Sequence, residues 1–559
     1  MLRRVLNHPG IHLHMKAKFS TSLTRPEYGI AALLTLGAIV LHVVLWANVG
    51  DPWRDEVNSI AVASSPTWSA TWDAMRYDSF PFLYFALLRV WTGVFGDAAA
   101  SLRALGLCLG LGGLGAVWWL GRRMHAGPPL LILAMVAISA ALIRYGDANR
   151  AYGLGLITAA LMLGTVWSLL FDSSKKNIAF AAIACLAATH STYQNSLLLL
   201  GIGSAAILAT AINRRWRSAA CIVAVCATTA ITTAIYLPSV SFAKSMMVVF
   251  PWSISVHDIL GVFGETVSNG YGDWQKWIWL AAILVGLTIA LLSLFIAIEQ
   301  PASTARSDAM TRSLFVLMVI PMLMLIYTMF MIWSDYAVRP WYLLGLMLVL
   351  AAVIEAGIAA LPEPPRAIRI ILPALALVIG MPAAANAPAE LKRRASNMPD
   401  LIAAIEREGG PQDLVIITEW YVGLTFNHLY KGNKPWMTIP DMGRHSVHRM
   451  DILKARMMDG QGVSRELEQI TRTLQSGHRV FVIGNFARLS PQMLRSQLPP
   501  APHPQYGWSS GNYTAYWAAQ AGAALSSYAS NAQLLNAPAS RETTMDWENY
   551  PLFVFSRGQ

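Results

Sequence analysis

Long apolar runs separated by short polar connections fill the chain between residues 29 and 386. A run of about twenty apolar residues is long enough to cross the hydrocarbon core of a bilayer as an α-helix. By this measure the sequence predicts eleven membrane-spanning helices. They lie near residues 29–49, 102–120, 128–143, 152–171, 178–190, 196–212, 218–237, 276–298, 314–333, 341–360 and 369–386. We therefore expect a polytopic α-helical membrane protein.

The connection between the first two predicted helices, residues 51–101, has a different pattern. Its middle alternates apolar and polar residues at helical spacing, with Trp68 and Trp72 four positions apart. Such a segment is typical of amphipathic helices that lie in the interface plane of a membrane. The pattern predicts interfacial helices in this first outward loop.

After residue 387 the long apolar runs stop. The stretch PAELKRRASNMPDLIAAIEREGG predicts a linker followed by an amphipathic helix. Four short segments, DLVIIT, WMTIP, RVFVIGN and NYPLFVFS, are typical of buried strands. Residues 387–559 are therefore predicted to form a separate α/β domain, and they contain no glycine-rich nucleotide-binding motif.

Composition agrees with a membrane protein. Of the 559 residues, 55% are hydrophobic and only 13% are charged, whereas a soluble domain carries about 25% charge. The net charge of +11 comes from Lys and Arg scattered singly and in pairs, which argues against nucleic-acid binding. All four cysteines lie in apolar runs, so no disulfide framework is expected.

Basic residues predict the orientation in the membrane. They fall in alternate connections, at Arg122, Arg123, Lys175, Lys176, Arg214, Arg215, Arg217, Arg306 and Arg312. Because such residues favour the cytoplasmic side, residues 1–28 are expected there and the C-terminal domain on the periplasmic or extracellular side of a bacterial cytoplasmic membrane. The basic N-terminus is typical of an uncleaved signal anchor, whether the chain starts at Met1 or Met15.

Polar side chains gather in the outward connections. The stretch DPWRDEVNSI, at the exit of the first helix, supplies Arg54, Asp55 and Glu56, and Asp78 follows in the same loop. The other outward connections supply Arg144, Asp147, Arg150, Tyr152, His190, Tyr193, Arg339 and Tyr342. Arginine can grip a phosphate through two hydrogen bonds, and a carboxylate can accept a proton from an attacking hydroxyl. The combination favours a reaction at a lipid phosphate.

Several of these segments resemble one known family. RDE after the first helix, YDSFPFLYFALLRVW and LRALGLCLGLGGLGAVWWLGRRM resemble the N-terminal half of the membrane glycosyltransferases of the C-type superfold that use polyprenyl-phosphate sugars. These include the protein O-mannosyltransferases and the lipid A aminoarabinose transferases. NRAYGLGLITAALMLG and RPWYLLGLMLVLAA are similar to their later Arg/Tyr segments, so the resemblance covers roughly residues 30–350.

The resemblance implies a polyprenyl-phosphate-sugar donor and an acceptor hydroxyl on a lipid, glycan or protein. Asp55 would serve as general base or acceptor-orienting carboxylate, supported by Glu56, with Asp78 as the second acidic group. The donor phosphate would meet Arg150 and Arg339, with Tyr152 and Tyr342 beside them. Possible auxiliary or acceptor contacts are Arg54, Arg144, Asp147, His190 and Tyr193.

One departure from the family concerns the residues after the second acidic position. Many relatives have H-P-P or K-P there, whereas this chain has Asp78-Ser79-Phe80-Pro81-Phe82. A phosphate contact or metal ligand at that point therefore does not carry over. No dedicated His/Asp cage is visible in the sequence, and a divalent metal stays an open possibility.

The leading hypothesis is inverting sugar transfer at the outer face of the membrane, with the C-terminal domain covering the site and helping to choose the acceptor. One alternative is a transporter or flippase of lipid-linked saccharides, which would place ionisable residues at mid-membrane and show repeated halves. Another is a structural or sensory protein that binds through its exported domain. Simpler interpretations also exist for single residues, such as ion pairs between Asp78 and Arg76 and between Arg144 and Asp147.

Overall fold

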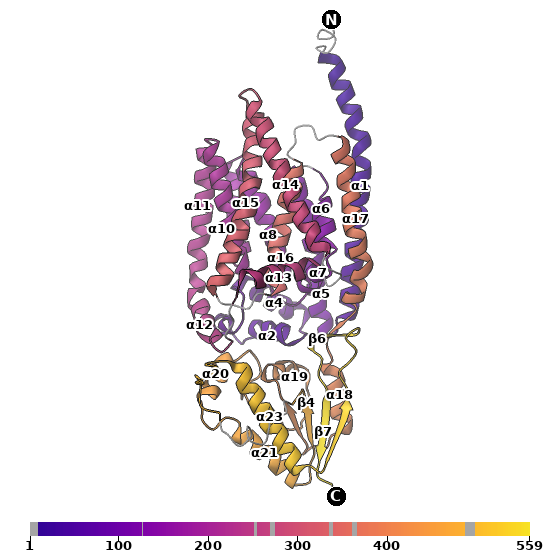
Figure 1. The fold of residues 1–559 in the computed structure, drawn as a ribbon, viewed down its shortest axis with the longest axis vertical. Coiled ribbons are helices and arrows are strands. Elements are labelled where there is room, and N and C mark those ends of the chain that lie inside the picture. The colour runs from indigo at the N-terminus through magenta and orange to yellow at the C-terminus, as the bar shows by residue number, and fades with distance from the viewer. Residues whose placement is uncertain are drawn as a thin grey trace.

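The structure is a computed structural model of the 559-residue chain. It describes residues 9–125, 127–250, 254–268, 274–334, 339–359, 366–486 and 498–558. A tall bundle of helices stands on a smaller α/β domain, and the first helix begins at the end of the bundle remote from that domain (Figure 1).

Most predicted spans are long continuous helices. Eight helical segments are long and apolar enough to cross a membrane, namely Pro26–Asn48, Ala99–His125, Tyr152–Leu169, Gln194–Ile212, Trp216–Met247, Trp274–Glu299, Thr304–Ser334 and Pro373–Leu391. They belong to α1 (Pro9–Asn48), α5 (Ala99–His125), α8 (Tyr152–Leu169), α10 (Gln194–Ile212), α11 (Trp216–Thr233) with α12 (Leu237–Met247), α14 (Trp274–Glu299), α15 (Thr304–Ser334) and α17 (Arg366–Leu391).

The other three predicted spans differ from simple long helices. Residues 128–143 do not form one helix, because α6 (Leu130–Ile132), a π-helical turn η2 (Leu133–Ala137) and α7 (Ala140–Gly146) follow one another with a break at Ser139. The other two, α9 (Lys175–Thr189) and α16 (Leu344–Ile358), have 15 residues each. Nearly all of α16 is buried inside the bundle, so its length is set by neighbouring helices rather than by lipid.

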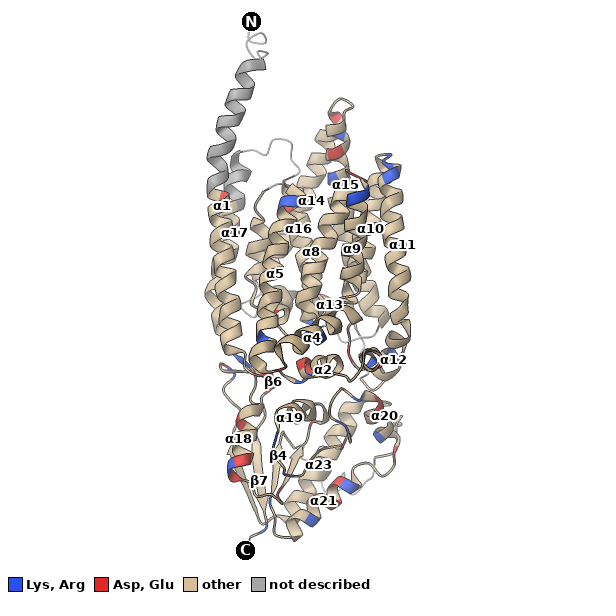
Figure 2. Ribbon diagram, turned by 180° about the vertical axis from the view of Figure 1, so that it is seen from behind, with Lys and Arg blue, Asp and Glu red and all other residues tan. Residues whose placement is uncertain are grey.

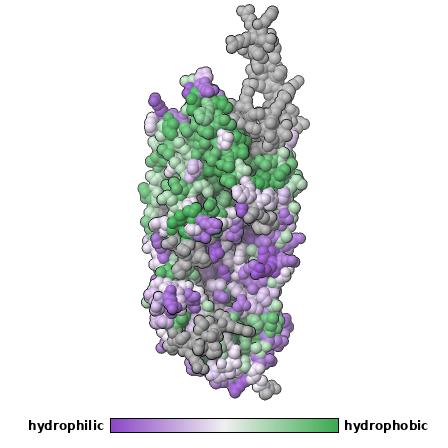
Figure 3. Space-filling model, viewed as in Figure 1, coloured by the Kyte–Doolittle hydropathy of each residue, from purple (hydrophilic) through white to green (hydrophobic). Residues whose placement is uncertain are grey.

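The bundle has the surface of an integral membrane protein. Large apolar side chains such as Ile231, Trp277 and Trp333 are more than half exposed, and apolar residues dominate the visible face of the bundle (Figure 3). Lys and Arg gather at the end remote from the C-terminal domain (Figure 2). Exposing such a surface to water would cost free energy, whereas lipid tails can contact it with little loss of free energy.

The first outward loop contains several short helices, as its pattern predicts. It contains α2 (Arg54–Ala63), α3 (Trp68–Ala74), the 3-10 turn η1 (Met75–Tyr77) and α4 (Phe82–Phe95). Pro81 lies directly before α4. The extended backbone at Asp78 separates α4 from η1. Together with α13 (Val256–Ser268) and the turns η3 (Ala234–Tyr236) and η4 (Pro340–Tyr342), these elements cover the end of the bundle that faces the C-terminal domain (Figure 1).

The C-terminal region is an α/β domain, as its pattern predicts. The four expected strands are present as β2 (Leu414–Ile417), β3 (Trp436–Thr438), β4 (Val480–Ile483) and β7 (Leu552–Ser556), and the expected helix is α18 (Met398–Glu408). Its other elements are β1 (Arg394–Ser396), η5 (Trp420–Val422), α19 (Gly423–Leu429), α20 (Met450–Met458), α21 (Ser464–Gln475), α23 (Ser510–Tyr528), β5 (Asn531–Asn536) and β6 (Thr544–Glu548).

A five-stranded mixed sheet, in the order β3-β2-β4-β7-β5, forms the centre of this domain. β2 pairs in parallel with β3 and β4, whereas β7 is antiparallel to β4 and β5. Alternate residues of β2 enter different cores, with Ile416 packed on the side of α20, α21 and α23 and Val415 on the side of α18 and α19. The sheet is therefore covered by helices on both faces, and α19 lies directly under α2.

Candidate active site

A cavity of about 580 Å³ lies where the bundle meets the C-terminal domain. Its bundle wall contains six of the residues predicted from the sequence, namely Asp55, Asp78, Arg150, Arg339, Tyr342 and the possible auxiliary residue Arg54. Its opposite wall comes from the C-terminal domain and contains Trp420, Tyr421, His448, Met450 and Trp547. Charged groups at the centre and aromatic rings around them give the cavity the composition of a binding site for a polar ligand.

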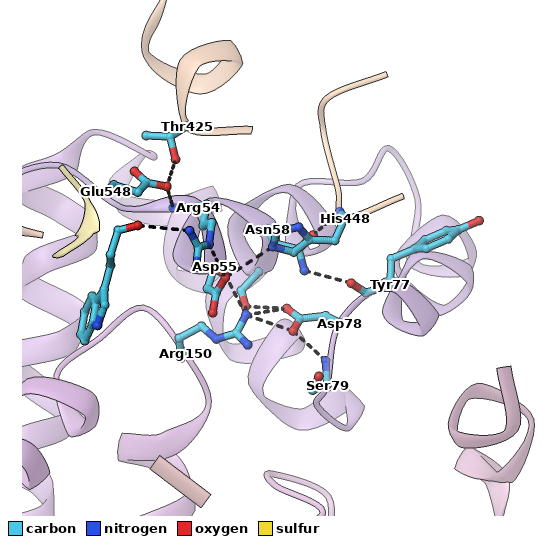
Figure 4. A network of polar contacts seen from close by, with 12 residues as sticks. Arg54, Asp55, Asn58, Tyr77, Asp78, Ser79, Arg150, Thr425, His448 and Glu548 are labelled. Carbon is cyan, nitrogen blue, oxygen red and sulfur yellow. Dashed lines mark hydrogen bonds and ion pairs between the residues drawn. The ribbon is translucent and has the colours of Figure 1, made fainter. Parts of the chain in front are cut away.

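Helix α2 presents Asp55 to this cavity. Gly50, with φ +73°, turns the chain out of α1, and α2 starts after Trp53. Asp55 lies in the first turn of α2, where the helix dipole favours a negative charge. Figure 4 shows α2 between two groups of residues, with Asp78 and Arg150 of the bundle on one side and His448 and Glu548 of the C-terminal domain on the other.

The surroundings of Asp55 are strongly cationic. Oδ1 of Asp55 lies 3.4 Å from Nε2 of His448 and 3.6 Å from Nε of Arg54. Burial alone would raise the pKa of this carboxyl group, but the contact with His448 and the charges of Arg150 and Arg54 outweigh it and hold the pKa well below its usual range. Asp55 is therefore a permanent carboxylate that is about one quarter exposed, at 26% of its side chain.

Asp78 and Arg150 form a buried pair next to Asp55. Nη1 of Arg150 donates to Oδ1 and Oδ2 of Asp78, at 3.0 and 3.2 Å. The same nitrogen donates to the carbonyl oxygen of Asp55 at 2.8 Å, and Ser59 donates to Asp78 at 2.6 Å. Asp78 thus pairs with Arg150 from a distant connection, and the predicted alternative of a pair with Arg76 is wrong.

The second amino group of the Arg150 guanidinium, Nη2, is placed to bind a further group. All hydrogen bonds of this side chain are made by Nη1, and among the described residues Nη2 has no hydrogen-bond partner. The guanidinium carbon lies 4.5 Å from the centre of the Phe80 ring, which fixes its plane. A planar guanidinium held in this way can offer its remaining N–H groups to a phosphate oxygen.

Close packing of glycines positions the connection that carries Arg150. A Cβ atom on Gly106 of α5 would lie 2.0 Å from the carbonyl oxygen of Asp147, and one on Gly153 of α8 would lie 2.1 Å from that of Gly146. Only glycine leaves room for the backbone at both points. Side chains at these positions would push residues 147–151 away from α2.

Glu56 has a different place from the one predicted. It does not line the cavity but is almost fully buried, with its carboxylate 2.5 Å from Nη1 of Arg103. It also accepts the backbone N–H groups of Trp53 and Asn149, at 3.1 and 2.7 Å. These contacts attach the start of α2 to α5 and to the connection that carries Arg150, so Glu56 positions the site without facing it.

The predicted auxiliary residues also lie away from the cavity, Arg54 excepted. Arg144 donates to the carbonyl oxygens of Glu390 and Arg393 at the end of α17, while Asp147 pairs with His42 of α1 at 2.7 Å. The predicted alternative of an Arg144–Asp147 pair is therefore wrong. His190 bonds Tyr236 at 2.7 Å, and the Tyr193 ring packs on the same tyrosine.

The two predicted tyrosines differ in position. Tyr342 follows Pro340 and Trp341 in η4, and it lines the cavity together with Arg339. Tyr152 is buried instead and packs edge to face on Phe80, with ring centres 5.1 Å apart. Tyr152 thus supports the ring beneath Arg150 from outside the cavity.

The C-terminal domain docks onto α2 through Glu548. Its Oε1 accepts the backbone N–H of Arg54 at 2.9 Å and the hydroxyl of Thr425 at 2.8 Å. Arg54 donates to the carbonyl oxygen of Trp547 at 3.1 Å, and its guanidinium lies 4.5 Å from the centre of the Tyr421 ring. A side chain from near the end of the chain thus receives an N–H group at the start of α2, one residue before Asp55.

Burial gives this contact a dependence on pH. It raises the pKa of Glu548 from 4.5 to about 7, against the opposing effects of Arg54 and Thr425. The folded protein therefore binds more protons at Glu548 than the unfolded chain does. The contribution of Glu548 to the free energy of unfolding is thus complete below pH 4.5 and is lost as pH rises through about 7. We expect the melting temperature of the detergent-solubilised protein to fall across this range. Asp55 has the opposite sign, because its lowered pKa adds stability that is present above pH 3.8 and is lost as pH falls below it.

The variant Glu548→Gln should remove this part of the pH dependence because a glutamine stays neutral and keeps an oxygen acceptor. Glu542→Gln, at an exposed position on the same segment, is the matched control and should melt as the wild type does at every pH. An unchanged slope between pH 4.5 and 7 in Glu548→Gln would contradict the assignment.

Metal ligands do not form a cluster in the part of the chain that the structure describes. No group of three or more His, Cys, Asp or Glu side chains is placed there so that it could hold a metal ion. Three carboxylates line the cavity, namely Asp55, Asp78 and Glu265 of α13, and the first two are engaged with arginine and histidine side chains.

The fold of nearly the whole chain is similar to that of a solved protein. ArnT from Cupriavidus metallidurans bound to undecaprenyl phosphate superposes with a TM-score of 0.50 and 13% sequence identity, over 94% of this chain and 98% of that chain. The resemblance stated from the sequence is thus confirmed at the level of the fold. Because the match covers nearly all of both chains, it includes the helical bundle and the C-terminal domain.

Weaker matches were also found. ArnT in the apo state gives a TM-score of 0.37 at 12% identity, over 94% of this chain and 98% of that one. The oligosaccharyltransferase of Archaeoglobus fulgidus, in complex with zinc and sulfate, gives 0.42 at 12% identity, over 80% of this chain and 67% of that one. No family model matches the chain, and no curated protein matches its sequence.

Proposed function

We propose that this protein transfers a sugar from a polyprenyl-phosphate-linked donor to an acceptor hydroxyl. The observation that carries the proposal is the presence of a permanent carboxylate, Asp55, and a guanidinium with an unused arm, Arg150, in one cavity at the end of the bundle (Figure 4). The fold shared with ArnT, which binds undecaprenyl phosphate, supports a lipid-linked donor.

In the proposed reaction the acceptor oxygen attacks the anomeric carbon and inverts its configuration. The bond from that carbon to the phosphate oxygen breaks, and its electron pair leaves with the polyprenyl phosphate. Arg150 and Arg339 stabilise the charge that grows on this phosphate, because guanidinium groups fixed in a partly dry cavity need no reorganisation. The hydroxyl releases its proton to a base next to Asp55, whose negative charge stabilises the proton there.

The proposed place of the reaction is the outer face of a bacterial cytoplasmic membrane. The clustering of Lys and Arg at the end of the bundle remote from the cavity supports this orientation (Figure 2). The wall formed by Trp420, Tyr421 and His448 supports a role of the C-terminal domain in choosing the acceptor. A lipid, a glycan or a protein could supply the hydroxyl.

The experiment that tests the proposal measures transfer of radiolabelled sugar from polyprenyl-phosphate sugars in membranes that contain the protein. We expect a labelled product that is absent from membranes without the protein. Parallel reactions with a chelator and with added magnesium or manganese test whether a divalent metal takes part.

A flippase of lipid-linked saccharides is the alternative. It would move labelled donor across vesicles without breaking the bond between sugar and phosphate. Transbilayer movement of intact donor with no transferred label, for every acceptor class offered, would favour the flippase and overturn the proposal.

A further inference from the structure

His448 of the C-terminal domain reaches across to the helix that carries Asp55. It follows β3 in the segment before α20, and its ring stands edge-on to Trp420 with ring centres 6.1 Å apart. The backbone N–H of His448 donates to the side chain of Asn58, one turn along α2 from Asp55, at 2.8 Å. Both the backbone and the ring of this residue are therefore fixed to α2.

The two ring nitrogens of His448 have different surroundings. Nε2 faces Oδ1 of Asp55 at 3.4 Å, while Nδ1 has no hydrogen-bond partner among the described residues. His448 lines the cavity together with Asp55 and Arg150. A carboxylate that holds one nitrogen of an imidazole fixes its tautomer and leaves the other nitrogen as the acceptor for a proton.

Asp55 itself is poorly suited to keep a proton. The positive charges around it hold its pKa well below the usual range of a carboxyl group. A general base works best when its pKa is near the operating pH, and imidazole has an unperturbed value of about 6.5. The two residues thus divide two tasks, with Asp55 providing a fixed negative charge and His448 an imidazole nitrogen that can accept a proton.

We propose that His448 is the general base of the transfer and that Asp55 positions and stabilises it, so that the active site is complete only when the C-terminal domain is docked. This inference rests on the proposed glycosyl transfer and adds a residue to it. It also names the domain that must be in place before the acceptor can react.

The proton of the acceptor hydroxyl has a defined path in this step. As the acceptor oxygen forms its bond to the anomeric carbon, its hydrogen passes to Nδ1 of His448. The imidazolium that forms carries its positive charge next to the carboxylate of Asp55. The phosphate leaves with the electron pair of the broken bond, and the imidazolium later releases its proton to water.

Several charged groups surround this pair and influence its pH dependence. Arg54 and Asn58 of α2 lie on one side, and Arg150 faces Asp55 from the bundle. Next to His448 in the chain, Arg449 and Asp451 form a pair at 2.7 Å to which Tyr77 of η1 also bonds. Glu548 lies behind Arg54, so its titration must be separated from that of His448.

The test is the pH dependence of kcat for sugar transfer by the full-length wild-type protein and by His448→Gln. Glutamine can still donate a hydrogen bond to Asp55 but cannot accept the proton. We expect a wild-type rate that falls on the acidic side, because a protonated imidazole cannot accept the hydroxyl proton. In His448→Gln we expect kcat to drop roughly 100-fold with little change in KM and the acidic limb to disappear. Added imidazole should restore part of the rate of His448→Gly.

Two control variants test whether a neighbouring titratable group causes the acidic limb. His445→Gln removes a histidine of the same segment that contacts Asp441 at 3.3 Å and does not line the cavity, so it should behave as the wild type. Glu548→Gln should keep the acidic limb. A wild-type limb that persists in His448→Gln, or one that disappears in Glu548→Gln, overturns the role of His448 while sugar transfer stands. Absence of transfer by the wild type overturns both.

Discussion

Replacing Asp55 by Asn is expected to lower the rate of sugar transfer by roughly 10²- to 10⁴-fold. Asparagine has the same shape and keeps an oxygen toward His448, but it removes the negative charge. Without that charge the imidazole of His448 is no longer held in one tautomer, and an imidazolium at His448 has no counter-charge. The measurement is transfer of radiolabelled sugar in membranes that contain equal amounts of wild type and variant.

The fold should survive this change, which makes the result interpretable. Asp55 is about one quarter exposed and asparagine keeps its shape, so we expect the variant to fold, with a melting temperature lowered by loss of the ion pairs to His448 and Arg54. Asp73→Asn is the matched control, because Asp73 is an exposed carboxylate of the same loop and does not line the cavity. Full activity in Asp55→Asn with a normal melting temperature would remove Asp55 from the reaction.

The candidate site could be predicted in part because successive connections between membrane-spanning helices lie on alternate sides of the membrane. Asp55, Asp78, Arg150 and Arg339 all lie in connections that alternate with the basic ones. The rule that basic residues stay in the cytoplasm therefore places all four at one end of the bundle, and the structure brings them to one cavity. Their pairing, such as that of Asp78 with Arg150, needed the three-dimensional arrangement of the helices.

Glu56 shows where the sequence was insufficient. Neighbouring residues on a helix point about 100° apart, so Asp55 and Glu56 point in different directions, and in the structure only Asp55 of the two lines the cavity. Both residues suit the first turn of a helix equally well, and no pattern in the loop distinguishes them. The answer depends on Arg103, which lies 47 residues further along the chain and binds Glu56 from α5.

The contribution of the C-terminal domain was expected only in outline. A covering role followed from its position after the last predicted helix, but His448 and Asn58 are 390 residues apart in the sequence. Docking depends on the matching of two folded surfaces, which hydrophobic periodicity does not record. The interrupted helix at residues 130–146 was missed for a related reason, because a buried apolar run looks the same whether or not its helix is continuous.

Arg150 offers the second large effect, and two substitutions separate its structural and chemical roles. In Arg150→Lys the ammonium can still neutralise Asp78, but it lacks the second arm that is proposed to bind the donor phosphate. We expect a fall of roughly 10²- to 10³-fold in kcat with a melting temperature close to that of the wild type. Arg76→Lys, at an exposed arginine of the same region, should keep full activity.

Arg150→Met should destabilise the fold as well as abolish transfer, because it leaves the carboxylate of Asp78 buried without a counter-charge. Removing one partner of a buried pair costs about 3–5 kcal/mol, whereas replacing both partners is often nearly neutral. The double variant Asp78→Asn with Arg150→Met should therefore regain much of the stability but none of the activity. Thermal melting and sugar transfer measured on the same preparations give both results. A double variant that recovers transfer would show that Arg150 acts only by neutralising Asp78, and the donor phosphate would then depend on Arg339 alone.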